Sequence, residues 1–184
     1  HEGEMIVIAA RPGMGKTAFA LNIATHAAMT TKKAIAIFNL EMSKEQLVNR
    51  MLSALGGIEG KKLQNGQMMQ TDWKKYNEAM SQLADTNMYI EDNAGITSSD
   101  IRAKCRRLAS KPEGLGLVII DYLQLLTLGG KRPDSRQQEV SDISRSIKTM
   151  AMELKVPVIA LAQLSRNAEK RENNEPMLAD LRES

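Results

Sequence analysis

The sequence contains a single cysteine, Cys105, among its 184 residues. One cysteine excludes an internal disulfide framework and a CxxC metal site, and such sparse use is typical of a reducing cytoplasm. Cys105 lies on the apolar side of a predicted helix. We therefore interpret it as a core residue and not as a catalytic thiol.

Aromatic side chains make up only 3% of the chain, which argues against a base-stacking surface for single-stranded nucleic acid. The 25 basic and 22 acidic side chains leave a net charge of +3, so charge alone does not indicate a polyanionic partner. If nucleic acid is bound, we expect its phosphate backbone to carry the contact.

Long apolar runs are missing as well. No stretch reaches the ~18 apolar residues that a membrane span needs, so we expect no contact with a membrane. The first residues, HEGE, form no basic and apolar leader, and the chain does not begin with Met. We interpret the chain as a piece of a longer protein, truncated at both ends, whose length suits one domain with a sizeable core.

Five short apolar segments are present instead, and they are continuous runs that do not alternate with polar residues. This pattern predicts strands buried on both faces. The segments are 5–10 (MIVIAA), 34–39 (AIAIFN), 88–92 (MYIED), 117–122 (LVIIDY) and 156–162 (VPVIALA). Helical spacing occurs between them, so we predict an α/β fold with a mostly parallel sheet and helices on both faces.

Three of the intervening segments group apolar residues on one helical face. These groups are Trp73, Tyr76, Met80 and Leu83; Ile101, Cys105 and Leu108, with Arg102, Lys104 and Arg106 outward; and Val140, Ile143, Ile147, Met150 and Leu154. A further helix is predicted to start at Ser43, because Ser43 and Gln46 have the spacing of a capping box, and to bury Leu47 and Met51. We expect surface loops at 55–67, 127–138 and 165–176.

Residues 9–17 (AARPGMGKT) lie between a predicted strand and a predicted helix. They are close to the phosphate-binding pattern G-x-x-x-x-G-K-[ST], with Ala10 at the first glycine position. In such a loop the backbone N–H groups surround the phosphates, the lysine reaches the outer phosphates and the hydroxyl binds Mg²⁺. A plain turn is the alternative, but the flanking elements favour a site for a nucleotide and Mg²⁺. Its residues are Arg11, Pro12, Gly13, Met14, Gly15, Lys16 and Thr17.

Three polar residues follow the ends of other predicted strands, where open α/β sheets bind their ligands. Asp121 ends LVIID, and its carboxylate is suited to the Mg²⁺ shell. Glu41 is the leading candidate for the base that deprotonates the attacking water, although it also fits an acid at the start of a helix. Gln163 is either a γ-phosphate sensor or an ordinary strand-end amide, and spacing does not decide between them.

Several stretches together resemble the C-terminal motor domain of DnaB-type replicative hexameric helicases, a branch of the RecA-like P-loop ATPases. They are ARPGMGKTAFALNIA, FNLEMSKEQLVNRMLS, VIIDYLQLL and IALAQLSR, and the likeness extends over residues 1–184. The resemblance implies a RecA-like ATPase domain. It also implies that ATP hydrolysis drives 5′-to-3′ movement on single-stranded DNA and duplex unwinding at the replication fork.

The resemblance also assigns roles to matching residues. Lys16 and Thr17 would bind phosphate and Mg²⁺, Glu41 would activate water and Asp121 would serve the metal. Gln163 would sense the γ-phosphate and Arg50 would be directed to the nucleotide. Single-stranded DNA would contact the loops after Asp121 and Gln163. Our DNA-binding candidates are Lys131, Arg132, Arg136, Arg166, Arg182 and Glu183, and for Glu183 we expect the backbone N–H to matter.

The resemblance further implies a homo-hexamer in the bacterial or phage-infected cytoplasm, with a helicase loader and a primase as partners. The family's arginine finger would lie beyond the last residue, so we expect weak activity from this piece alone. Two alternatives are a RecA-like recombinase or clock-type ATPase, and a nucleotide-gated module that binds DNA or a loader without turnover. LEMSKEQLVNRML argues against the first, and Glu41 argues against the second.

Overall fold

The computed structural model describes residues 1–127 and 136–164. Its strands are β1 (Met5–Ala10), β2 (Ala34–Asn39), β3 (Met88–Glu91), β4 (Leu115–Asp121) and β5 (Val158–Gln163). Its helices are α1 (Lys16–Thr30), α2 (Lys44–Gly56), α3 (Gly60–Asn65), α4 (Gln70–Ala84), α5 (Ser98–Ala109) and α6 (Arg136–Leu154), with the short 3-10 helix η1 (Leu123–Leu125). The five apolar segments are therefore all strands, with ends shifted by two residues or fewer.

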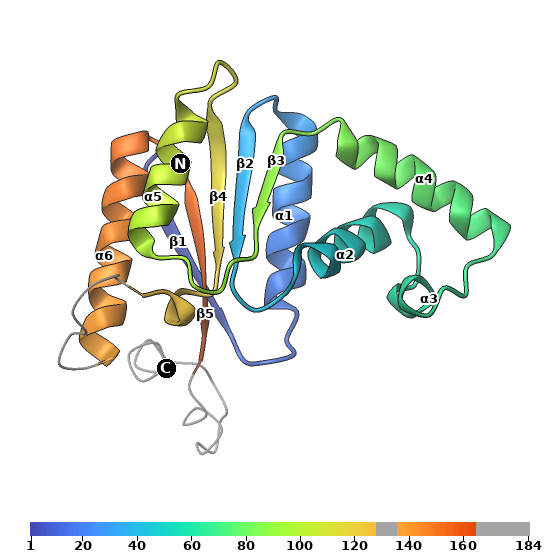
Figure 1. Ribbon diagram of the computed structural model, residues 1–184, viewed down its shortest axis with the longest axis horizontal. Coiled ribbons are helices and arrows are strands. Elements are labelled where there is room, and N and C mark those ends of the chain that lie inside the picture. Colours follow the sequence, from blue (N-terminus) through green and yellow to red (C-terminus); the bar gives the residue numbers. More distant parts are fainter. Residues whose placement is uncertain (128–135, 165–184) are drawn as a thin grey trace.

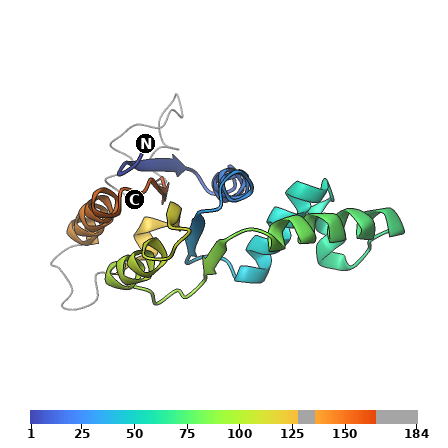
Figure 2. The same ribbon diagram turned by 90° about the horizontal axis from the view of Figure 1, so that it is seen from above.

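Within the described residues the strands form one parallel sheet in the order β1-β5-β4-β2-β3. Helices α5 and α6 cover one face, and α1 with α2 covers the other (Figures 1 and 2). Each face has its own apolar core, which includes Ile143 and Ile147 on one side and Leu21 and Leu47 on the other. The predicted α/β layering is confirmed, and the central strands β2, β4 and β5 are buried on both faces as predicted. The same prediction is wrong for the edge strands β1 and β3, where Ile6, Val7 and Tyr89 are 44%, 45% and 38% exposed.

The predicted inward faces of α5 and α6 are also confirmed. Ile101, Cys105 and Leu108 are buried, and burial raises the pKa of the Cys105 thiol to about 12. On the outer side, Arg102 and Arg106 both pair with Glu153 of α6, and Arg106 Nε lies 2.8 Å from the Glu153 carboxylate. These two arginines hold the pKa of Glu153 below its usual value. The charged outer rows of the two helices therefore contact each other.

The segment from α2 to α4 extends away from the sheet on the β3 side (Figures 1 and 2). The capping box at Ser43 is formed, and Leu47 and Met51 are buried as predicted. One other expectation is wrong here, because the loop expected at 55–67 contains α3 and a buried Ile58. The predicted helix α4 is present, and its apolar face leaves Trp73 49% and Met80 37% exposed. Because α4 lies beyond the sheet edge, it has no sheet beneath it to cover that face.

None of the helices in residues 1–127 and 136–164 has the length and apolarity that crossing a membrane requires. The two segments left outside the described residues, 128–135 and 165–184, follow the carboxyl ends of β4 and β5. The expected surface loop at 127–138 lies mostly outside the described residues, and α6 begins within it at Arg136.

Candidate nucleotide site

The loop between β1 and α1 has the backbone geometry that a phosphate cradle needs. Gly13 and Gly15 have φ angles of 78° and 82°, in the left-handed region that side chains disfavour. Gly15 is the N-cap of α1, and no side chain of the described residues caps that helix end. The backbone N–H groups of the first turn are therefore available to an anion, and the helix dipole favours negative charge there. Ala10 is the last residue of β1 and pairs with Gln163 in a strand conformation, which explains why a methyl group is tolerated.

Asp121 lies at the centre of the site and is 1% exposed. Its Oδ2 accepts a hydrogen bond from Thr17 Oγ1 at 2.6 Å and one from Asn39 Nδ2 at 3.2 Å. Its Oδ1 lies 3.5 Å from Lys16 Nζ, an ion-pair distance that is long for a hydrogen bond. No donor in the described residues hydrogen-bonds Oδ1. The two residues predicted to bind phosphate and metal thus converge on the one predicted metal carboxylate.

The sheet brings the remaining candidates to the same place. A pocket of about 300 Å³ is lined by Glu41, Arg50 and Gln163 together with the loop residues. Its loop lining is Ala10, Arg11, Pro12, Gly13, Gly15, Lys16 and Thr17. Met14 does not line this pocket and is 73% exposed. The geometry is compatible with the predicted nucleotide-binding and catalytic roles, which stay predictions.

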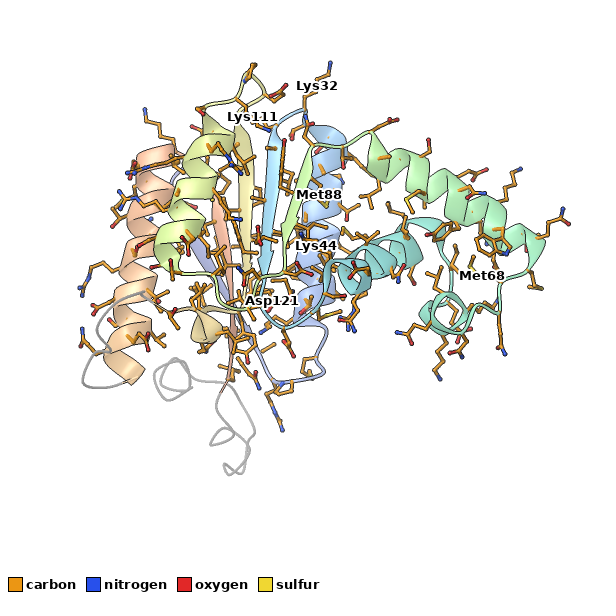
Figure 3. All side chains as sticks on the ribbon, in the orientation of Figure 1. Lys32, Lys44, Met68, Met88, Lys111 and Asp121 are labelled. Atoms are coloured by element: carbon orange, nitrogen blue, oxygen red, sulfur yellow. The ribbon has the colours of Figure 1, made fainter. Side chains whose placement is uncertain are left out.

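The site lies at one end of the sheet. Figure 3 shows Asp121 and Lys44 at the lower edge, where β2 and β4 end, and Lys32 and Lys111 at the opposite edge. This placement follows from the topology, because the carboxyl ends of parallel strands all meet at the same edge. Lys44, at the start of α2, pairs with Asp92 after β3, with 3.6 Å between Nζ and the carboxylate. The helix that carries Arg50 is therefore anchored beside the pocket.

Sequence reasoning missed three residues of this site. Asn39 connects Asp121 to the turn that carries Glu41. Tyr122 lies beneath Lys16, whose Nζ is 4.8 Å from the ring centre, and its pKa is raised by burial and by the charges of Glu41 and Asp121. Asn39 was identifiable as a polar residue that ends an apolar strand. No comparable signal marked Tyr122, because its contact with Lys16 depends on the fold.

Gln124 is the third missed residue. It lies in η1, and its side chain holds the backbone of Gln163 from both sides. Nε2 donates to the carbonyl oxygen at 3.1 Å, and Oε1 accepts from the N–H at 3.4 Å. The end of β5 is thereby fixed to the segment that follows Asp121.

A second pocket of about 650 Å³ adjoins the first, between α1, α2 and α3. Met42 and Arg50 line both pockets, so Arg50 lies at their border and not wholly within the nucleotide pocket. The P-loop glycines line only the smaller pocket.

The donor set can be tested for its fit to Mg²⁺. No group of three His, Cys, Asp or Glu side chains suited to a metal occurs in the part of the chain that the structure describes. Mg²⁺ does not require such a group, since it commonly takes one or two carboxylates together with substrate phosphates and water. The buried Asp121 Oδ1 without a hydrogen-bond donor, next to the Thr17 hydroxyl, fits that coordination.

The predicted DNA contacts are not tested. Lys131, Arg132, Arg166, Arg182 and Glu183 lie outside the described residues, and of Arg136 only its place at the start of α6 is described.

Comparison with known protein families shows to which family the chain belongs. The family described as "DnaB-like helicase C terminal domain" matches residues 1–184. The chain belongs to this family. The RecA-like fold predicted from the resemblance is confirmed, and the family match decides against a recombinase or clock-type ATPase.

Two relatives show the extent of the similarity. The chain is 54% identical over 184 residues to "Replicative DNA helicase DnaC" of Bacillus subtilis (strain 168), and 54% identical over 184 residues to "Replicative DNA helicase DnaB" of Geobacillus stearothermophilus. In both comparisons all of this chain and 40% of the relative are covered. The chain thus spans less than half the length of these curated relatives.

Solved structures agree with the sequence comparison. "The Structure Of A DnaB-Like Replicative Helicase And Its Interactions With Primase" superposes with a TM-score of 0.92 at 41% identity, covering 100% of this chain and 44% of that one. A second solved structure, described as an ATPase domain, superposes with a TM-score of 0.93 at 40% identity, covering 100% of this chain and 66% of that one.

Proposed function

We propose that this chain is the ATP-hydrolysing motor domain of a replicative DNA helicase and couples hydrolysis to 5′-to-3′ movement on single-stranded DNA. The observation that carries the proposal is the convergence of the P-loop, Glu41, Gln163 and Arg50 on one pocket, with Asp121 buried behind Lys16 and Thr17. This is the constellation that phosphoryl transfer to water requires, since positioning and charge stabilisation supply most of the catalysis.

Each residue of the pocket has a role that follows from its position. The N–H groups of the P-loop and the start of α1 bind the phosphates, and Lys16 neutralises their charge. Thr17 and Asp121 would hold Mg²⁺, which when bound would supply positive charge for the phosphate oxygens. Glu41 is exposed at the mouth of the pocket, where it orients and deprotonates the attacking water.

The remaining two side chains flank the nucleotide. Gln163, at the end of β5, contacts the γ-phosphate, and Arg50 approaches from α2. Because Gln124 fixes the backbone of Gln163, the amide side chain can move while its strand end stays in place.

The proposal includes the context in which the domain works. We propose a homo-hexamer of the full-length protein in the cytoplasm of a bacterial or phage-infected cell. Single-stranded DNA, a helicase loader and a primase are its proposed partners. A structural relative described with its interactions with primase supports the last of these.

The proposed function is tested by two variants of the full-length parent. Lys16→Ala removes the charge that faces the phosphates, so ATP·Mg²⁺ binding should nearly vanish. Glu41→Gln keeps the shape of the side chain and removes the base, so binding should persist while turnover falls ~100-fold or more. Calorimetry measures the binding, and phosphate release measures the turnover.

Each variant has a matched control at the opposite edge of the sheet. Lys32→Ala and Glu113→Gln change the same residue types in exposed positions, and both should behave like the parent. Unchanged nucleotide affinity in Lys16→Ala would reject the phosphate site. A parent that binds ATP and never hydrolyses it would favour the nucleotide-gated module.

A further inference from the structure

Asn39 is the last residue of β2 and lies opposite Asp121 in the parallel register of β2 and β4. It is 1% exposed, which is unusual for an amide side chain. A buried amide is stable only when its polar atoms are hydrogen-bonded. The hydrogen-bond partners of Asn39 therefore indicate the structural role of its side chain.

The oxygen and the nitrogen of the Asn39 amide both form hydrogen bonds, and their partners lie in different parts of the site. Oδ1 accepts hydrogen bonds from the backbone N–H of Glu41 at 3.0 Å and of Met42 at 2.7 Å. Nδ2 donates to Asp121 Oδ2 at 3.2 Å. The orientation of the amide is fixed by these neighbours, since the two N–H groups need an acceptor and the carboxylate needs a donor.

These bonds connect two parts of the site that are far apart in sequence. Oδ1 closes the turn by which the chain leaves β2, and that turn sets the position of Glu41. Nδ2 holds the oxygen of Asp121 that also accepts from Thr17. Lys16 and Thr17 line the pocket, whereas Asn39 is buried in the sheet and does not line it.

The chemistry of the amide suits this connection. Asp at position 39 would place a second carboxylate against Asp121 and lose the donor, and Leu has no polar atoms. The amide combines an acceptor for two N–H groups with a donor for a carboxylate.

We propose that Asn39 is a positioning residue that keeps the Glu41 turn and the Asp121 carboxylate in a fixed relation, so that base and metal ligand are aligned together. This inference rests on the proposed function and adds a residue to that site. Supporting groups of this kind typically affect metal affinity or activity by ~10- to 100-fold when removed.

The test uses Asn39→Ala in the full-length parent, alone and combined with Glu41→Gln. Turnover and KM are measured from phosphate release. Binding of a fluorescent methylanthraniloyl-ATP is titrated with Mg²⁺, which requires no turnover. Ile147→Ala, a core change in α6 away from the site, shows what destabilisation alone does, and each rate is expressed per folded molecule.

We expect Asn39→Ala to lower kcat ~10- to 100-fold with KM within ~3-fold of the parent, and to raise the half-saturating Mg²⁺ concentration by a comparable factor. At saturating Mg²⁺, which offsets the weakened Asp121 contact, the same change in the Glu41→Gln background should cost less than ~3-fold in kcat, because the base it positions is already gone. Ile147→Ala should lower the melting temperature and leave the Mg²⁺ requirement unchanged.

Equal losses in both backgrounds, or an unchanged Mg²⁺ requirement together with an unchanged kcat, would overturn the positioning role. If Asn39→Ala does not fold, Asn39→Ser is judged by the same criteria. A parent that binds the nucleotide without turnover still tests the Asp121 contact through Mg²⁺. A parent that binds no nucleotide would reject the proposed function itself, and this inference with it.

Discussion

The two oxygens of Asp121 have different surroundings, although both are buried. Oδ2 is held by Thr17 and Asn39, whereas Oδ1 has only the Lys16 ammonium at 3.5 Å. A buried carboxylate oxygen without a hydrogen-bond donor is costly unless a cation compensates it. The site is therefore built with one oxygen fixed by the protein and one oriented toward positive charge, as a metal ligand requires.

Cys105 gives a prediction at the scale of one residue. Its pKa is raised from 9.0 to about 12, because the core disfavours the thiolate. Because the unfolded thiol loses its proton at a lower pH than the folded one, the stabilisation from burying Cys105 is complete only below about pH 9. It is lost as the pH rises toward 12. The loss is at most ~1.4 kcal/mol per pH unit. Denaturant unfolding of the chain and of Cys105→Ala should show it.

In that experiment the difference in unfolding free energy between parent and variant should stay constant from pH 7 to about pH 8.5 and shrink above it, near the unfolded thiol pKa. A native thiol that reacts at neutral pH as fast as the unfolded chain would contradict the burial argument.

At the scale of elements, the sequence predicted mainly those features that depend on a short continuous stretch of residues. The five strands and the P-loop are continuous stretches whose composition and spacing carry the signal. A local pattern marks Asn39 as a polar strand end, but its contact with Asp121 and that of Tyr122 with Lys16 depend on strand register and side-chain packing. Asn39 contacts Asp121, 82 residues away, only because β2 and β4 are neighbours.

In helix α4 a local pattern is present but does not lead to burial. Its apolar residues lie on one face, yet Trp73 and Met80 remain exposed. Periodicity reports that a helix has an apolar face but not whether the chain supplies a surface to cover it. Apolar contact holds only part of α4, since Ala79 is buried and Leu83 packs against the core, and polar bonds fix its start. Asp72 accepts from the Met69 N–H at 3.1 Å and pairs with Lys62 of α3 at 3.2 Å, and these bonds lower its pKa.

The start of α2 yields a prediction about an element. Ser43 Oγ accepts from the Gln46 N–H, and Gln46 Oε1 accepts from the Ser43 N–H at 3.1 Å. Ser43→Ala removes this cap and should cost ~1 kcal/mol of stability. For a domain of this size that corresponds to a fall of roughly 2–4 °C in melting temperature.

Ser81→Ala is the matched control for the cap, because Ser81 is exposed in the last turn of α4 and alanine favours a helix. Its melting temperature should equal or exceed that of the parent. Equal melting temperatures for Ser43→Ala and the parent would show that the capping box contributes nothing to the folded domain.

At the scale of the whole molecule, the sheet order brings together the ends of two strands that are far apart in sequence. β4 and β5 are neighbours, with Asp121 paired to Leu161, and both run toward the edge that carries the pocket of Glu41 and Gln163. Gln124, in the segment after β4, holds the backbone of Gln163 at the end of β5. The segments that lead to both predicted DNA-binding loops are therefore in direct contact at the candidate γ-phosphate residue.

The last prediction concerns these loops in the full-length parent. One subunit offers few phosphate contacts that are not offset by neighbouring acids, so we expect strong binding only when a ring repeats the loops and links their contacts. Each neutralised phosphate adds ~0.7 to the slope of log affinity against log salt for single strands. Arg182→Ala should therefore weaken binding to oligo-dT and to mixed sequences alike and flatten the slope, while ATP binding stays intact.

Arg107→Ala, on the exposed side of α5, is the control and should leave the slope unchanged. A salt titration of both variants decides the matter, and an Arg182→Ala slope equal to that of the parent would remove this residue from the DNA site.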